Sequence, residues 1–335
     1  MKLLRILPLL LVASLTACSN EIYYEDTTYL FHTHVSYKIK GYRGYTGLKT
    51  EGEAVNALKE VDAYTDAYQK RDIVGIYDLN NTNEKIEISK DLYRLLAFCQ
   101  DVQQKAKYFN PLIGSLSNKW KEALANNQVP SDDVIQEELT KINTSSLILD
   151  NTNSVGKYYA QRLGDALIDL GAIAKGYALD RAEDVLSVYS TTDDYLINAG
   201  SSSILLGTNT QKKKGVEEGN YVIKIKELSK DTYLHCNKSF ISTSGISEQK
   251  TIIDNVTYSH IVNPLTGSVE PLYDAVIVIN STIGFMNGSL GDALSTSLMM
   301  SSLEEIKEVE EKENIEVIII KDDDILYKSK SVELH

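Results

Sequence analysis

The chain has 335 residues, of which 43% are apolar, enough for one large or two moderate domains with a buried core. Acidic residues outnumber basic ones by 47 to 34, which gives a formal net charge of −13. Because so acidic a surface repels phosphate backbones and anionic lipid headgroups, we expect no nucleic-acid partner. The negative charge of any phosphorylated ligand would have to be neutralised by a metal ion or by a few lysines at the binding site.

The N-terminus has the features of a bacterial export signal. Residues 1–5 are short and basic, and residues 6–15 form an apolar run too short to span a bilayer. The run ends in Leu15-Thr16-Ala17-Cys18, which resembles the lipobox of bacterial lipoproteins. Cleavage of the signal peptide 1–17 would leave a fatty-acylated Cys18, so we predict attachment to the cell membrane on its extracytoplasmic face. A plain secretory signal with an incidental cysteine is the weaker alternative.

The remaining chain mixes helical and strand patterns without regular βαβ alternation. Residues 18–30 are interpreted as a tether that precedes a single domain over 31–330. Apolar spacings of three and four predict helices, two of them opened by Ser89 and Ser131, at 51–70, 89–107, around Trp120, 131–142, 286–300 and 303–313. Short β-branched and aromatic runs predict strands at 31–40, 147–149, 155–159, 195–200, 203–206, 221–226, 233–236, 275–279, 315–320 and 325–327. This order favours an α+β fold with mixed, largely antiparallel sheets and packed helices.

Residues 169–177 have the composition of a ligand-binding corner. Residues 166–168 are apolar and helical spacing follows from Ile173, so we expect a strand ending at Asp169, a glycine turn and then a helix. The turn would bring backbone close to a ligand, and the helix N-terminus favours anions. Lys175 lies in the first turn, where the helix dipole disfavours a cation, so we expect it to have another partner. An ordinary strand-to-helix corner with a solvated lysine is the alternative.

Three later stretches carry groups suited to binding phosphate and metal. Residues 241–245 are rich in hydroxyls, and residues 259–267 place a histidine and an amide beside a Pro…Gly turn. Asp292 and Thr296 are four residues apart, so a carboxylate and a hydroxyl share one helix face. Together with a backbone carbonyl and phosphate oxygens, this carboxylate and hydroxyl form a set of oxygen ligands suited to Mg²⁺. Each stretch alone fits an ordinary turn or helix, whereas together they indicate one site.

These motifs, in this order, resemble those of the ApbE-type flavin transferase family, whose members move FMN from FAD onto a Ser or Thr of an acceptor protein. The matching segments are 169–177, 198–200, 242–245, 260–267 and 292–296, with weaker matches at 109–114, 31–33 and 67–68. The resemblance spans residues 30 to 330. It implies an ApbE-like fold and a Mg²⁺-dependent FAD:protein FMN transferase, often exported and lipid-anchored.

The resemblance also implies roles for individual residues. The Ala172 carbonyl, Asp292 and Thr296 would ligate Mg²⁺, and Asp292 and His260 would be catalytic, with His260 assisting deprotonation of the acceptor hydroxyl. Contacts with FAD would come from Phe31, Tyr68, Tyr108, Phe109, Asn110, Asp169, Lys175 and Ile261. The implied partners are FAD as substrate and a redox-complex subunit bearing the pattern Asp-x-x-Ser/Thr-Gly-Ala-Thr.

The chain departs from the family pattern at several polar positions. Asn110 and Asn263 stand where the family has acids, and where the family has Asn-Ala-Gly-Gly-Asp this chain continues after Gly200 with Ser201, Ser202 and Ser203. An amide keeps hydrogen bonds but carries no charge, which affects base activation more than FAD binding. Two alternatives therefore stay open: a Mg²⁺-dependent FAD pyrophosphatase that gives FMN and AMP, and a non-catalytic FAD-binding lipoprotein. Cys99 lies in an apolar helical stretch and Cys236 follows Leu234 and His235, and both are interpreted as buried small residues.

Overall fold

The computed structural model describes residues 21–152, 156–190, 193–211, 214–247, 250–281 and 284–335. The predicted signal peptide, Cys18 and Val155 of one predicted strand lie outside the described residues. Among the described residues, no helix is long and apolar enough to cross a membrane.

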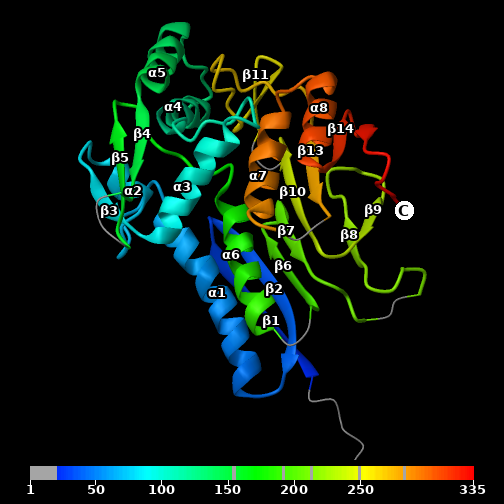
Figure 1. Ribbon diagram of the computed structural model, residues 1–335. Coiled ribbons are helices and arrows are strands. Elements are labelled where there is room, and N and C mark those ends of the chain that lie inside the picture. The colour runs from blue at the N-terminus through cyan, green and yellow to red at the C-terminus, as the bar shows by residue number, and fades with distance from the viewer. Residues whose placement is uncertain (1–20, 153–155, 191–192, 212–213, 248–249, 282–283) are drawn as a thin grey trace, which may run out of the picture.

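An eight-stranded sheet, antiparallel throughout, runs through the molecule in the order β1-β2-β6-β7-β10-β13-β14-β15 (Figure 1). Its strands are β1 (Glu21–Leu30), β2 (Thr33–Tyr42), β6 (Tyr195–Ala199), β7 (Ser203–Leu206), β10 (Ser239–Gly245), β13 (Ala275–Asn280), β14 (Glu316–Lys321) and β15 (Asp324–Lys328). The prediction of an α+β fold with largely antiparallel sheets is confirmed.

The middle of this sheet is buried on both faces. Val276 and Val278 of β13 belong to the large core under the helices, while Ile277 and Ile279 belong to a second core on the opposite face. Successive side chains of a strand point to opposite faces, so a strand buried on both sides is a continuous apolar run. The helical face is covered by α1 (Tyr45–Thr65), α6 (Ala174–Tyr189) and α7 (Asn287–Leu298), and the hairpin of β8 (Tyr221–Lys224) and β9 (Tyr233–Cys236) contributes to the second core.

The remaining elements surround one end of this core. They are α2 (Ile76–Asn80), β3 (Ile86–Ile88), α3 (Lys90–Val102), α4 (Gly114–Ala125), α5 (Asp132–Thr144), β4 (Ser146–Asp150), β5 (Tyr158–Leu163), β11 (Lys250–Ile253), β12 (Val256–Ser259) and α8 (Leu303–Glu313). Ser89 Oγ accepts a hydrogen bond from Leu92 N at 3.1 Å, and Ser131 Oγ accepts one from Val134 N at 3.4 Å. Both predicted N-caps are therefore confirmed, because each serine satisfies a free N–H of the first helical turn.

Two local predictions are wrong. Residues 21–30 of the predicted tether form β1, which pairs with β2 along its whole length, because its tyrosines and threonines suit a pleated surface. Tyr23 also donates its hydroxyl proton to the buried Asp194 at 2.6 Å. The second error is the strand at 166–168, which is an irregular segment. Its backbone is paired elsewhere: the Asn80 side chain bonds both the N–H and the carbonyl of Ile168, so no ladder is needed.

Candidate active site

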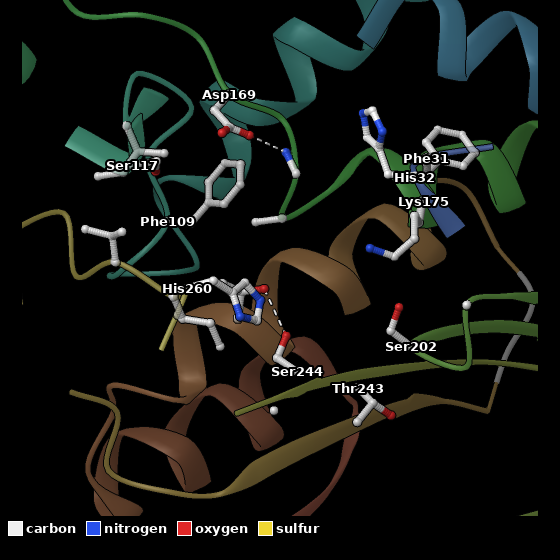
Figure 2. A pocket seen from close by; sticks show the side chains of 18 of the residues that line it. Phe31, His32, Phe109, Ser117, Asp169, Lys175, Ser202, Thr243, Ser244 and His260 are labelled. Atoms are coloured by element: carbon white, nitrogen blue, oxygen red, sulfur yellow. Dashed lines mark hydrogen bonds between the residues drawn. The ribbon is translucent and has the colours of Figure 1, made fainter. Parts of the chain in front are cut away.

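A cavity of about 490 Å³ lies where segments far apart in the sequence converge (Figure 2). Its walls come from the β1–β2 turn, the loop before α4, the start of α6, the end of β10, the segment after β12 and α7. Most of the residues singled out from the sequence line it, namely Phe31, Tyr108, Phe109, Asn110, Asp169, Ala172, Lys175, His260, Ile261 and Thr296. Tyr68 and Asp292 lie outside the lining, but the Tyr68 hydroxyl donates to Asp169 and the Asp292 backbone carbonyl accepts from Thr296, and both of these partners line the cavity.

Asp292 is buried where α6 crosses α7. Its Oδ1 accepts hydrogen bonds from Ser203 Oγ at 2.8 Å and Ser242 Oγ at 2.7 Å, and its Oδ2 accepts one from Gly176 N at 2.6 Å. A Cβ on Gly176 would lie 2.1 Å from the Gly288 carbonyl oxygen, so only glycine allows the helices to approach this closely. Gly176, which follows Lys175, thus allows the first turn of α6 to lie close to the Asp292 carboxylate of α7.

The pKa of Asp292 is raised, because burial outweighs the neighbours that favour its charged form. Burial raises the pKa of Asp292, whereas the charge of Lys175, the two serine hydroxyls and the Gly176 amide all act to lower that pKa. The charge of Lys175 therefore favours the buried carboxylate, an interaction that suits a lysine placed where the helix dipole disfavours a cation. Its side chain also lines the cavity, so it is available to an anionic ligand.

Beside this carboxylate, the cavity wall presents neutral oxygen donors. Thr296 Oγ1 donates to the Asp292 carbonyl oxygen at 3.1 Å and lies 3.0 Å from Ser244 Oγ. Ala172 lines the same cavity at the turn before α6. Hydroxyl, carbonyl and carboxylate oxygens are the ligands that Mg²⁺ prefers, and the three hydrogen bonds to Asp292 use three of its four lone-pair positions. The donor set is chemically suited to a magnesium ion that also takes oxygens from its ligand.

Asp169 is held at the mouth of the cavity by a small network. Its Oδ1 accepts from Gly171 N at 2.8 Å, which tightens the turn into α6, and its Oδ2 accepts from the Tyr68 hydroxyl at 3.1 Å. Lys121 Nζ lies 2.6 Å from that hydroxyl and 3.9 Å from Asp169 Oδ2. Tyr68 thereby gains a fixed place next to the cavity although its ring is exposed.

His260 is exposed and lines the cavity, and the segment that carries it is held in place by contacts with Trp120. The Trp120 indole N–H donates to the Gly267 carbonyl at 2.7 Å, and the Trp120 ring stacks on Tyr258. Asn263 Oδ1 accepts from the backbone N–H groups of the two residues after Pro264, at 2.9 and 3.3 Å. Asn263 therefore shapes its own turn, a role that an amide fills as well as an acid does.

The model of the ApbE family matches residues 31–319. The chain belongs to the ApbE family. It is 24% identical to the FAD:protein FMN transferase of Haemophilus influenzae over 324 residues, which cover 94% of this chain and 91% of that protein. The flavin transferase ApbE of Vibrio cholerae and the ApbE protein of Thermotoga maritima have similar structures, with TM-scores of 0.72 and 0.74 at 21% and 22% identity. These structures cover 93% and 92% of this chain, which covers 98% of each, and they show the fold.

Sequence reasoning missed several residues of this ApbE-family cavity. They are Ser117, Lys121, Ser202 and Lys226; His32 lines the cavity as well, within the matched segment 31–33. Ser202 lies in the run of serines already noted as unusual, and Lys121 directly follows the single tryptophan. Nothing local marks Lys226, because it reaches the cavity only through the path of the chain after β8.

The helix that carries Asp292 and Thr296 is itself capped from α6. Asp180 accepts from Gly288 N and Ser289 N, each at 2.8 Å, at the first turn of α7. We expect Asp180→Ala to lower the free energy of unfolding by about 2 kcal/mol, because two buried helix N–H groups lose their acceptors. Chemical denaturation measures this loss. Asp184→Ala, an exposed carboxylate on the same helix, is the control, and an equal loss in that variant would contradict the capping role.

Proposed function

We propose that this chain transfers FMN from FAD to a Ser or Thr hydroxyl of an acceptor protein and releases AMP, with Mg²⁺ bound in the cavity. The observation that carries the proposal is one cavity that joins a lysine coupled to a buried carboxylate, a set of oxygen donors and an exposed histidine. Membership in the ApbE family and relatives named FAD:protein FMN transferase support it. This proposal includes Asp292, Thr296 and the Ala172 carbonyl as metal ligands.

The proposed reaction is an in-line phosphoryl transfer. The acceptor oxygen forms a bond to the FMN phosphorus, the bond from that phosphorus to the bridging oxygen breaks, and AMP leaves with the bridging oxygen. His260 takes the proton of the acceptor hydroxyl, for which its exposed position on a braced turn suits it. Asn263 carries no charge that could stabilise the imidazolium, so in this proposal His260 acts without a carboxylate at that position.

The diphosphate must be held and its charge offset before attack. Lys175 supplies a positive charge at the wall, and the turn at Gly171 and Ala172 presents backbone close to the ligand. Mg²⁺ would neutralise charge on the diphosphate oxygens and stabilise the leaving AMP. Asp169, held by Tyr68 and Gly171, lies where it can accept hydrogen bonds from a nucleotide.

Two other functions make different products from the same cavity. If water replaces the acceptor hydroxyl, the protein is an FAD pyrophosphatase, and if nothing reacts, it is an FAD-binding lipoprotein. The test is to incubate the protein with FAD and Mg²⁺, with and without an acceptor domain, and to identify the flavin products by mass. Transfer predicts FMN on the acceptor together with free AMP. Free FMN in both samples indicates the pyrophosphatase, and unchanged FAD indicates the binding protein.

The proposed location is the extracytoplasmic face of the cell membrane, through a lipid on Cys18. This rests on the sequence Leu15-Thr16-Ala17-Cys18. A single type of anchor must then hold the protein, because an acidic chain gains little from anionic headgroups. We expect Cys18→Ala to move the protein from the membrane fraction to the soluble fraction or to leave its signal uncleaved. Unchanged processing and membrane association would contradict lipidation.

A further inference from the structure

The turn between β1 and β2 holds two bulky residues in a backbone conformation that favours glycine. Leu30 pairs with Thr33, so Phe31 and His32 alone form the turn, with φ angles of 52° and 57°. Hairpin turns of this kind ordinarily contain pairs such as Asn-Gly, because a Cβ is crowded by backbone when φ is positive. The fold therefore accepts strain at both positions.

The strained turn is braced from two sides. Asp62 of α1 accepts a hydrogen bond from Phe31 N at 2.6 Å. On the other side it meets the β6–β7 turn so closely that a Cβ on Gly200 would lie 2.6 Å from Thr33 Oγ1. Strained residues persist where the surrounding structure over-determines them, and they cluster at ligand sites. The bracing fixes the backbone of the turn and therefore the point from which the His32 side chain extends.

Both turn residues line the cavity, and His32 is exposed within it. In Figure 2, His32 and Lys175 lie toward one side of the cavity, and His260 and Ser244 lie toward the other. The charged lining is basic despite the acidic chain, with three lysines against Asp169 and Glu227. An imidazole offers N–H donors that a glycine in the same turn would lack. A ligand rich in anionic oxygens is the kind that gains most from such a donor.

We infer that His32 contacts the diphosphate of FAD, donating an imidazole N–H to one of its oxygens on the side of Lys175. The inference rests on the proposed use of FAD and adds a specificity-determining residue to it. The histidine thus explains why a strained side chain is kept at a turn where glycine would fold more easily. His260, in contrast, serves the incoming hydroxyl, so the two histidines have separable effects.

The test is His32→Gly, measured for binding and for stability. Glycine relieves the positive φ, so Tm should rise by about 2 °C, while the affinities for FAD and for ADP should both fall by about tenfold. A weaker affinity in a more stable protein cannot be attributed to misfolding. Riboflavin, which lacks phosphate, should bind the variant and the wild type equally. Binding is followed by calorimetry and by flavin fluorescence.

Lys238→Gly is the matched control. Lys238 also has a positive φ, of 42°, but it lies at the β9–β10 turn and does not line the cavity. The Lys238→Gly substitution should stabilise the fold without changing the affinity for FAD. Unchanged FAD and ADP affinities in His32→Gly would overturn the inference, and so would a loss for FAD with ADP unaffected. If the wild type fails to bind FAD at all, the proposed function itself fails, which is a distinct result.

Discussion

Asp292→Asn is expected to lower the Mg²⁺-dependent release of AMP from FAD by about 10²–10³-fold, the scale seen when one preorganised electrostatic group is removed from a transition state. The side chain keeps its size, and its one carbonyl oxygen can still accept from Ser203 and Ser242. It loses the negative charge that faces Lys175 and the oxygen that Gly176 N bonds. Metal affinity should therefore fall while the helices stay packed.

The measurement is AMP release as a function of Mg²⁺ concentration, with thermal unfolding as the check on folding. Asp292→Ala is less informative, because it leaves two hydroxyls and an amide without their acceptor in a buried place. Asp184→Asn serves as the matched carboxylate-to-amide control on an exposed part of α6. An Asp292→Asn variant with full activity and an unchanged Mg²⁺ requirement would remove Asp292 from the metal site.

His260→Ala should slow flavin transfer by about 10²–10⁴-fold, which is the usual contribution of one general base. FAD affinity should change by less than about twofold, because Lys175, Asp169 and the oxygen donors are all retained. The imidazole is exposed and its segment is held by Trp120 through backbone, so the fold does not depend on it. The loss is thus expected in the rate constant of transfer rather than in binding.

Single-turnover transfer at saturating FAD, paired with FAD titration, separates these two quantities. His34→Ala is the control, since His34 is an exposed histidine on β2 that does not line the cavity. A parallel loss of FAD affinity in His260→Ala would mean that the histidine binds the nucleotide. Transfer at the wild-type rate would mean that the acceptor hydroxyl loses its proton elsewhere.

The motifs of the central turn and of α7 are predictable from the sequence because their spacing is local. The spacing of four positions from Asp292 to Thr296 places both on one side of a helix, and both do lie at the same part of the site. The spacing does not say that Asp292 turns inward. That orientation depends on serines of β7 and β10 and on the Gly176 amide, which the sheet order brings together from distant parts of the chain.

Two errors have the same physical origin. The apolar residues 166–168 have a strand-like composition, yet the side chain of Asn80, 88 residues away, takes the hydrogen bonds of Ile168 that a ladder would use. The polar composition of β1 resembles that of a linker, and the segment is a strand only because its backbone pairs with β2. The matched segment 31–33 includes His32, but the turn that it forms was not predicted, because Phe and His carry none of the ordinary turn signals.

Covalent transfer of FMN to protein can be measured as a change in the intact mass of an acceptor domain. The acceptor should carry the pattern Asp-x-x-Ser/Thr-Gly-Ala-Thr and be incubated with the wild-type protein, FAD and Mg²⁺, beside an acceptor whose target hydroxyl residue is alanine. We expect the acceptor that keeps the target hydroxyl, and not the alanine variant, to gain the mass of one FMN less one water, with an equal amount of AMP in solution. Free FMN and AMP with both acceptors unmodified would contradict covalent transfer.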